Sequence, residues 1–223
     1  HPRRGRPGAG PLKAPSQPSS GRNPEEALSK AGEFLERALR VDPTSRAALQ
    51  QMGELRLEQH DLAEARQRLR EILTLNEEPI EAGADPVAVR AERAEQNARA
   101  RMTLAKVEST GGDHPKALEI LAPVIEGQPG NLEALSIKAR ILELQGRMEE
   151  ALEALEVVAR VGDQAQDQAS MLGSRLERSR LFQKMGDKAA AIQELQKART
   201  VAEKSGDIKS VVLVTHLINR LEE

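Results

Sequence analysis

The chain has 223 residues, and its 33 Lys and Arg against 35 Asp and Glu leave a formal net charge of only −2. It has no Cys, which excludes a disulfide framework, a Cys-based zinc site and a thiol nucleophile. Hydrophobic residues make up 39% and charged residues 30%, a mixture typical of a helical globular protein rather than a disordered chain. The longest apolar run is about five residues, against the ~20 that a membrane span needs, so no membrane insertion is expected.

Residues 1–24 differ in composition from the rest. They hold six of the twelve prolines, five basic residues and no acidic residue. So few apolar side chains cannot offset the entropy of ordering, and we predict a disordered Pro/Gly-rich basic tail or linker. No apolar core of a secretory signal follows the arginines. The chain begins at His1 rather than Met, which leaves open a processed form or a fragment of a longer protein.

From residue 24 onward the sequence carries repeated signals for the start of a helix. Residues 23–26 (Asn-Pro-Glu-Glu) combine a capping Asn, a proline in the first turn and a Glu that can reach back to the cap. Further N-caps are predicted at Asp61, Asp85, Asp113, Asn131 and Asp187. No segment shows the sustained alternation of a strand, so the sequence predicts an all-α protein.

The predicted helices form a repeat, marked by an alanine with an apolar residue four positions later. The five pairs are Ala31/Leu35, Ala65/Leu69, Ala117/Leu121, Ala151/Leu155 and Ala191/Leu195. Their alanines are 34, 52, 34 and 40 residues apart, that is 34 with insertions of 18 and 6. Twelve positions before each of the last four alanines is a small residue: Gly53, Ala105, Ala139 and Ser179. Small residues at both positions allow two antiparallel helices to approach closely.

This pattern resembles the tetratricopeptide repeat (TPR) family, whose unit is a helix–turn–helix of 34 residues. The resemblance covers about 25–205 and is clearest over 46–79. It implies a right-handed α-solenoid of antiparallel helix pairs. The predicted units are a half repeat at 25–43, repeats at 46–79, 86–131 (with an extended first helix), 132–165 and 166–205, and a C-terminal capping helix at 207–223.

Two features depart from the family pattern, and the last helix has a role of its own. Charged residues stand where apolar ones are expected: Arg101, Glu108, Lys138, Arg175 and Arg178. The 18-residue insertion predicts a loop up to Asp85 followed by one long helix from Pro86 to Ser109. The last helix has an apolar stripe that suits a cap, although an open edge that binds a partner or a second copy is the alternative.

The sequence offers little support for a catalytic, metal-binding or cofactor-binding site. The histidines His1, His60, His114 and His216 form no pair at helical i, i+4 spacing, and no nucleophile elbow, P-loop or dinucleotide fingerprint is present. We therefore expect no enzyme activity, no cofactor and no metal. Residues 25–223 carry 28 basic and 35 acidic residues and no Trp or Tyr for stacking bases, so nucleic-acid binding is not expected either.

In the TPR family the first helix of each repeat lines a concave face, where peptides bind, and the resemblance implies the same here. Projecting these helices predicts groove residues Glu54, Arg99, Met102, Lys106, Ser136, Arg140, Leu176, Arg180 and Lys184. Glu54, Lys106, Arg140 and Arg180 occupy equivalent slots, and three successive cations suit an acidic or C-terminal peptide. The alternative is that these positions are simply solvated, as expected in a chain with many charges.

The function predicted is a non-catalytic scaffold that binds a peptide or partner protein in the groove. Two alternatives stay open: a self-assembling solenoid that forms homo-oligomers, and a regulatory module tethered to an upstream catalytic domain. The absence of Cys and of a signal segment favours the cytoplasm, although Cys-free repeat proteins also occur outside cells.

Overall fold

The computed structural model describes residues 24–223, and this part of the chain consists of α-helices joined by turns and loops. The predicted tail lies outside the described residues, except for Pro24, the first residue of α1. The helices are α1 (Pro24–Val41), α2 (Arg46–Glu58), α3 (Leu62–Leu75), α4 (Pro86–Thr110), α5 (His114–Gly127), α6 (Leu132–Leu144), α7 (Met148–Gln164), α8 (Gln168–Met185), α9 (Lys188–Ser205) and α10 (Ile208–Glu222).

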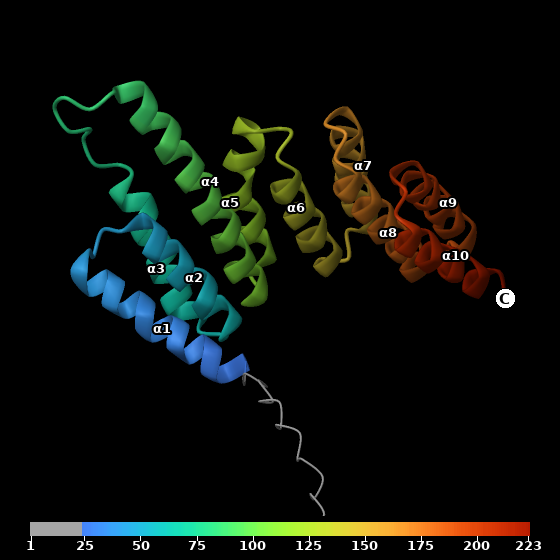
Figure 1. The fold of residues 1–223 in the computed structure, drawn as a ribbon, viewed down its shortest axis with the longest axis horizontal. Coiled ribbons are helices and arrows are strands. Elements are labelled where there is room, and N and C mark those ends of the chain that lie inside the picture. The colour runs from blue at the N-terminus through green and yellow to red at the C-terminus, as the bar shows by residue number, and fades with distance from the viewer. Residues whose placement is uncertain (1–23) are drawn as a thin grey trace, which may run out of the picture.

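The helices follow one another in chain order along the long axis of the molecule, from α1 at one end to α10 at the other (Figure 1). Each helix packs against the next one in the chain, and short turns join the pairs α2/α3, α4/α5, α6/α7 and α8/α9. In addition, α2 packs against α4 and α4 against α6. The predicted all-α solenoid of helix pairs is confirmed.

The core lies between the packed helices and contains most residues of the predicted repeat. The alanines and leucines of the last four pairs are all buried. The first pair is different, because Ala31 is exposed and Leu35 is only half-buried. Helix α1 packs mainly against α2, and the face that carries Ala31 stays exposed within the described chain. The repeat pattern therefore predicted the wrong burial at Ala31.

The close approach of α2 and α3 depends on Gly53. A Cβ added to this residue would lie 2.7 Å from Cγ of Leu69, a side chain that is fully buried. Ala105, Ala139 and Ser179 are buried at the corresponding positions of the later pairs. The predicted small-residue contact is confirmed, and at Gly53 it leaves no room for a methyl group.

Five predicted N-caps are confirmed, whereas Asn23, the predicted cap of α1, lies outside the described residues. Each side chain accepts a hydrogen bond from a backbone N–H in the first turn; the caps are Asp61, Asp85, Asp113, Asn131 and Asp187. Asp167 and Asp207 cap α8 and α10 in the same way. These bonds satisfy donors that have no partner inside the helix, and they fix where each helix begins.

The N-cap of α9 allows the contribution of such a hydrogen bond to the free energy of unfolding to be measured. Asp187 Oδ1 accepts from the Ala190 N–H at 2.9 Å, so Asp187→Ala is expected to lower the free energy of unfolding by about 1 kcal/mol. Ser45 occupies the N-cap of α2 but makes no side-chain capping bond, so Ser45→Ala is the matched control with a smaller loss. Urea unfolding followed by circular dichroism measures both; equal losses would contradict the assigned role of the Asp187 carboxylate.

The insertion between α3 and α4 forms a loop over residues 76–85, followed by the single long helix that the sequence predicts. Arg93 of α4 donates to the backbone carbonyls of Asn76 and Glu78. The Asn76 side chain accepts from Arg46 at 2.6 Å and donates to Asn97 at 2.8 Å. These contacts tie the start of the loop to α2 and α4.

Helix α10 lies at the C-terminal end of the row and packs against α9 through Val214 and Ile218. Its opposite face leaves Ile208, Val212 and Leu213 exposed. The helix thus covers the end of the solenoid with one face and presents an apolar surface on the other. Among the described helices, none is both long enough and apolar enough to cross a membrane.

Several charges that depart from the family pattern belong to buried ion clusters. Glu108 of α4, whose side chain is 3% exposed, accepts two bonds from Arg66 of α3 at 2.9 Å and lies 3.1 Å from the Lys116 ammonium. Glu194 of α9 is similarly buried against Arg175 and Arg178 of α8. The unexpected charges at these positions therefore connect neighbouring helices.

Candidate interaction groove

Helices α2, α4, α6 and α8 line four hollows that follow one another along the solenoid. Their volumes are about 410, 340, 490 and 420 Å³. Glu54 and Arg99 line both the first and the second hollow. Lys106 and Glu133 line the second and the third, and Arg140 lines the third and the fourth. Because neighbouring hollows share residues, they form one continuous groove.

Most of the residues predicted from the sequence line this groove. Eight of the nine predicted residues line at least one hollow: Glu54, Arg99, Met102, Lys106, Ser136, Arg140, Leu176 and Arg180. Lys184 lines none of the four, but its ammonium binds Glu143, which does. The projection from a helical repeat therefore brings together side chains from four helices that are far apart in the sequence. Whether a peptide binds to them stays a prediction.

Two of the three cations predicted to attract an acidic peptide, Lys106 and Arg180, are already paired within the protein. Lys106 donates to Glu133 at 2.8 Å. Arg180 lies 2.7 Å from the Glu177 carboxylate and also binds Glu143. The groove therefore does not present three free cations in a row, and its electrostatics depend on these internal carboxylates.

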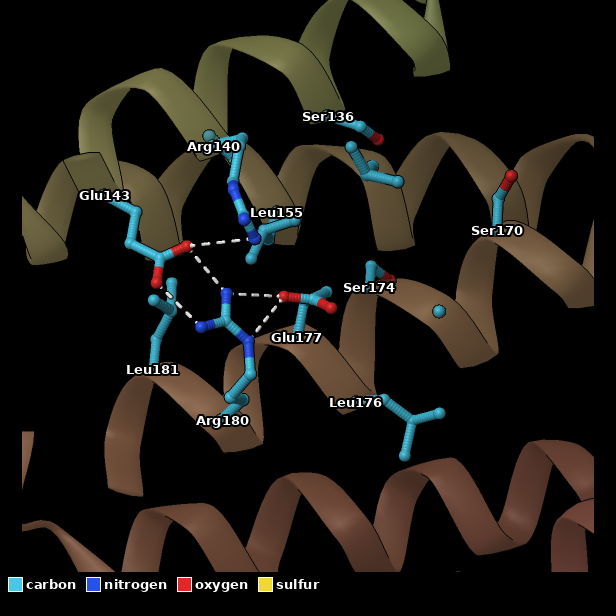
Figure 2. A pocket seen from close by; sticks show the side chains of 13 residues that line it. Ser136, Arg140, Glu143, Leu155, Ser170, Ser174, Leu176, Glu177, Arg180 and Leu181 are labelled. Atoms are coloured by element: carbon cyan, nitrogen blue, oxygen red, sulfur yellow. Dashed lines mark hydrogen bonds and ion pairs between the residues drawn. The ribbon is translucent and has the colours of Figure 1, made fainter. Parts of the chain in front are cut away.

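Glu143 is a groove residue that the sequence did not predict. Its side chain is only 6% exposed, and its two oxygens accept from the two Nη atoms of Arg180 at 2.7 and 2.6 Å. Figure 2 shows the Arg180 guanidinium between Glu143 and Glu177, with Arg140 reaching toward the same carboxylate from α6. These bonds outweigh burial and hold the pKa of Glu143 at about 2, while the pKa of Arg180 is raised in turn.

One available signal pointed to Glu143. It follows Arg140 by three residues in α6, and residues three apart on a helix share a face. An acidic residue on the groove stripe would therefore have been expected beside a predicted cation. Its link to Arg180, 37 residues away in the sequence, depends on how α6 and α8 are placed and has no local signature.

The cluster leaves Arg140 as its least engaged cation. Arg140 is 66% exposed, and its Nη1 lies 3.9 Å from Glu143, beyond hydrogen-bond distance. Arg140, Arg180 and Lys184 against Glu143 and Glu177 give the cluster a net charge of +1. The groove therefore keeps one positive charge here, and Arg140 is placed to offer it.

A sequence model of the tetratricopeptide repeat family matches residues 110–176. This span begins at the last residue of α4 and ends within α8. A comparison with curated protein sequences finds no significant match.

Solved structures of TPR proteins share the fold. A putative kinesin light chain protein with TPR-like repeats from Podospora anserina is 21% identical, covers 82% of this chain and 91% of its own, and has a TM-score of 0.61. MamA from Desulfovibrio magneticus RS-1 is 14% identical over 81% of this chain and 89% of its own, with a TM-score of 0.57. YrrB, described as a TPR protein with an unusual peptide-binding site, is 17% identical over 86% of each chain, with a TM-score of 0.52.

These structural similarities show a common fold at low sequence identity. The family match identifies residues 110–176 as tetratricopeptide repeat sequence, and the chain shares its fold with these TPR proteins over more than 80% of its length.

Proposed function

We propose that this protein is a non-catalytic scaffold that binds a peptide, or an extended segment of a partner protein, along the groove of α2, α4, α6 and α8. The observation that carries the proposal is the continuity of the groove, to which four helix pairs contribute side chains. Stacked helix pairs create extended concave surfaces of this kind, and such surfaces bind other chains. The peptide-binding site described for YrrB, a protein of the same fold, supports the proposal.

The proposed ligand is acidic where it crosses α6 and α8. Exposed Arg140 and the net charge of +1 in its cluster favour a carboxylate at this place. The repeat boundaries at 25–43, 46–79, 86–131, 132–165 and 166–205 and a cytoplasmic location also remain proposals.

A charge-reversal experiment tests the groove. The double variant Lys106→Glu/Arg140→Glu changes two groove cations and leaves the Arg180–Glu143 contact in place. The charge-matched control is Arg160→Glu/Arg220→Glu, at exposed positions of α7 and α10 that line none of the four groove hollows. We expect the groove variant to lose at least tenfold in affinity for a partner captured by the wild-type chain from host lysate, and the control to retain it.

Helicity of both variants is measured by circular dichroism, so that loss of binding can be separated from loss of fold. Equal capture of all partners by the wild type, the groove variant and the control would contradict the proposed site.

Self-association is a second candidate function, favoured by the exposed apolar face of α10. Ile208, Val212 and Leu213 are exposed on α10, which packs only against α9 among the helix pairs with extensive contacts. A molar mass that rises with concentration, and that falls back to the monomer value in Val212→Asp, would support it. A monomer mass at all concentrations would exclude it.

A further inference from the structure

The fourth hollow of the groove differs from the others in how its walls are held apart. Helix α2 packs against α4 and α4 against α6, whereas the backbones of α6 and α8 lie farther apart within the described chain and are joined by the ion pairs of Glu143 with Arg180 and Lys184. Both pack against α7 instead. The space between them is a hollow of about 420 Å³, closed at one end by the Arg140–Glu143–Arg180 cluster (Figure 2).

The base of this hollow is apolar. Leu155 and Val158 of α7 and Leu181 of α8 line it, and all three belong to the buried core. The wall on α8 includes the small residues Ser170, Gly173 and Ser174 beside Leu176. A Cβ added to Gly173 would meet no atom within 4 Å, so the hollow has room for a further group.

The serines that line the hollow need no hydrogen-bond acceptor from a ligand. Ser136 Oγ donates to the Leu132 carbonyl at 2.8 Å, and Ser174 Oγ donates to the Met171 carbonyl at 2.9 Å. Ser170 Oγ donates to Asp167 at 2.6 Å. Because each hydroxyl hydrogen is already bonded within its own helix region, an apolar group can enter without leaving these donors unsatisfied.

The charged end of the hollow offers one cation to a ligand. The donors of Arg180 bind Glu143 and Glu177, whereas Arg140 is largely exposed and lies 3.9 Å from its nearest carboxylate. A carboxylate placed next to an apolar group in the hollow would be within the field of Arg140 and of the net positive cluster.

We infer that this hollow binds one large aliphatic side chain of the partner segment, while a neighbouring carboxylate of the same segment pairs with Arg140. The inference rests on the proposed function, because it names the anchor within the proposed groove. Small wall residues and an apolar base select the side chain, and Arg140 selects the adjacent negative charge.

Three small probes test the two parts of this anchor on the full chain. N-acetyl-L-leucine carries both the side chain and the carboxylate, N-acetyl-L-leucinamide lacks the charge, and acetate lacks the side chain. In a titration followed by ¹⁵N amide shifts, we expect N-acetyl-L-leucine to bind with a millimolar dissociation constant and to perturb residues 136–143 and 170–181. The amide is expected to bind up to about fivefold more weakly, and acetate weakest of all.

Two variants assign the contacts. Gly173→Leu fills the hollow from α8 at a position with open space, and we expect it to weaken N-acetyl-L-leucine at least tenfold while the unfolding midpoint is retained. Arg140→Gln is expected to remove the preference for the acid over the amide. Arg160→Gln is the control, because Arg160 is an exposed arginine of α7 that lines none of the four groove hollows, and it should leave both the affinity and the preference for the acid unchanged.

Absence of shifts with N-acetyl-L-leucine at tens of millimolar, shifts located elsewhere, or unchanged binding by Gly173→Leu would overturn the anchor. Equal binding of acid and amide would overturn the role of Arg140. If capture of the lysate partner is still lost in Lys106→Glu/Arg140→Glu in these cases, the anchor is refuted but the proposed scaffold function is not. If no capture depends on groove charge, the proposed function itself fails.

Discussion

Gly53→Ala is expected to lower the free energy of unfolding by about 1–3 kcal/mol, the usual cost of overpacking a well-packed core. The added methyl carbon would lie 2.7 Å from Cγ and 2.9 Å from Cδ2 of Leu69, which is fully buried between α2, α3 and the next pair. In an exposed helix the same change would be stabilising, because alanine favours helix more than glycine does. Urea unfolding followed by circular dichroism measures the difference.

The Leu69→Ala background shows whether this contact is the cause. Leu69→Ala alone is expected to cost about 2–5 kcal/mol, because it leaves a cavity in the core. In Gly53→Ala/Leu69→Ala the new methyl group enters the space that the leucine occupied. The double variant should therefore lose clearly less than the sum of the two single losses. Additive losses would show that the two positions do not compete for the same space.

Gly173→Ala is the control for the effect of glycine itself. This residue also lies inside a helix, but a Cβ there meets nothing within 4 Å. The change is expected to stabilise the protein by about 0.5–1 kcal/mol. If Gly→Ala lowers the free energy of unfolding at position 53 and raises it at position 173, packing and not helix propensity decides the effect at Gly53.

The sequence predicted those parts of the fold that depend on local chemistry. A capping Asp acts on a backbone N–H two or three residues later, and the alanine and leucine of a repeat lie on one turn of the same helix. Both signals are complete within a short segment. The exception, Ala31, has the right local pattern but lies on a face of α1 that stays exposed within the described chain.

The charged interactions were not predictable in the same way. Arg66 and Glu108 are 42 residues apart, and Arg180 and Glu143 are 37 apart. Each pair forms only when the helices stack. In the sequence alone, Glu108 is therefore a departure from the family pattern and Arg180 is a cation without a visible partner. Eight of the nine residues chosen by the helical projection line the groove hollows, but the projection carried no information on which of them would neutralise one another.

These buried carboxylates predict acid sensitivity. Hydrogen bonds from Arg66 lower the pKa of Glu108 to about 2, and those from Arg180 lower the pKa of Glu143 to about 2, from the ordinary 4.5. Glu194 shifts in the same direction, held by Lys197, Arg178 and Arg175 against burial. A carboxylate with a lowered pKa stabilises the folded state fully above its unfolded pKa. That stability is lost as the pH falls from about 4.5 through 2, when the unfolded chain takes up protons first.

The gap from 4.5 to about 2 corresponds to at most ~3 kcal/mol for each of Glu108 and Glu143, reduced by solvent around their partly exposed cations. Urea unfolding at pH 7 and pH 3 should show part of this loss in the wild type, because pH 3 lies between the unfolded and the folded pKa values, and a smaller pH dependence in Glu108→Gln and Glu143→Gln. Glu126→Gln is the control, since Glu126 is exposed on α5 and has no ion pair among the described residues. If all three variants keep the wild-type pH dependence, other carboxylates govern acid unfolding. A smaller pH dependence in Glu108→Gln and Glu143→Gln alone would show that acid destabilises the solenoid at two clusters. One cluster joins α3, α4 and α5, and the other joins α6 and α8.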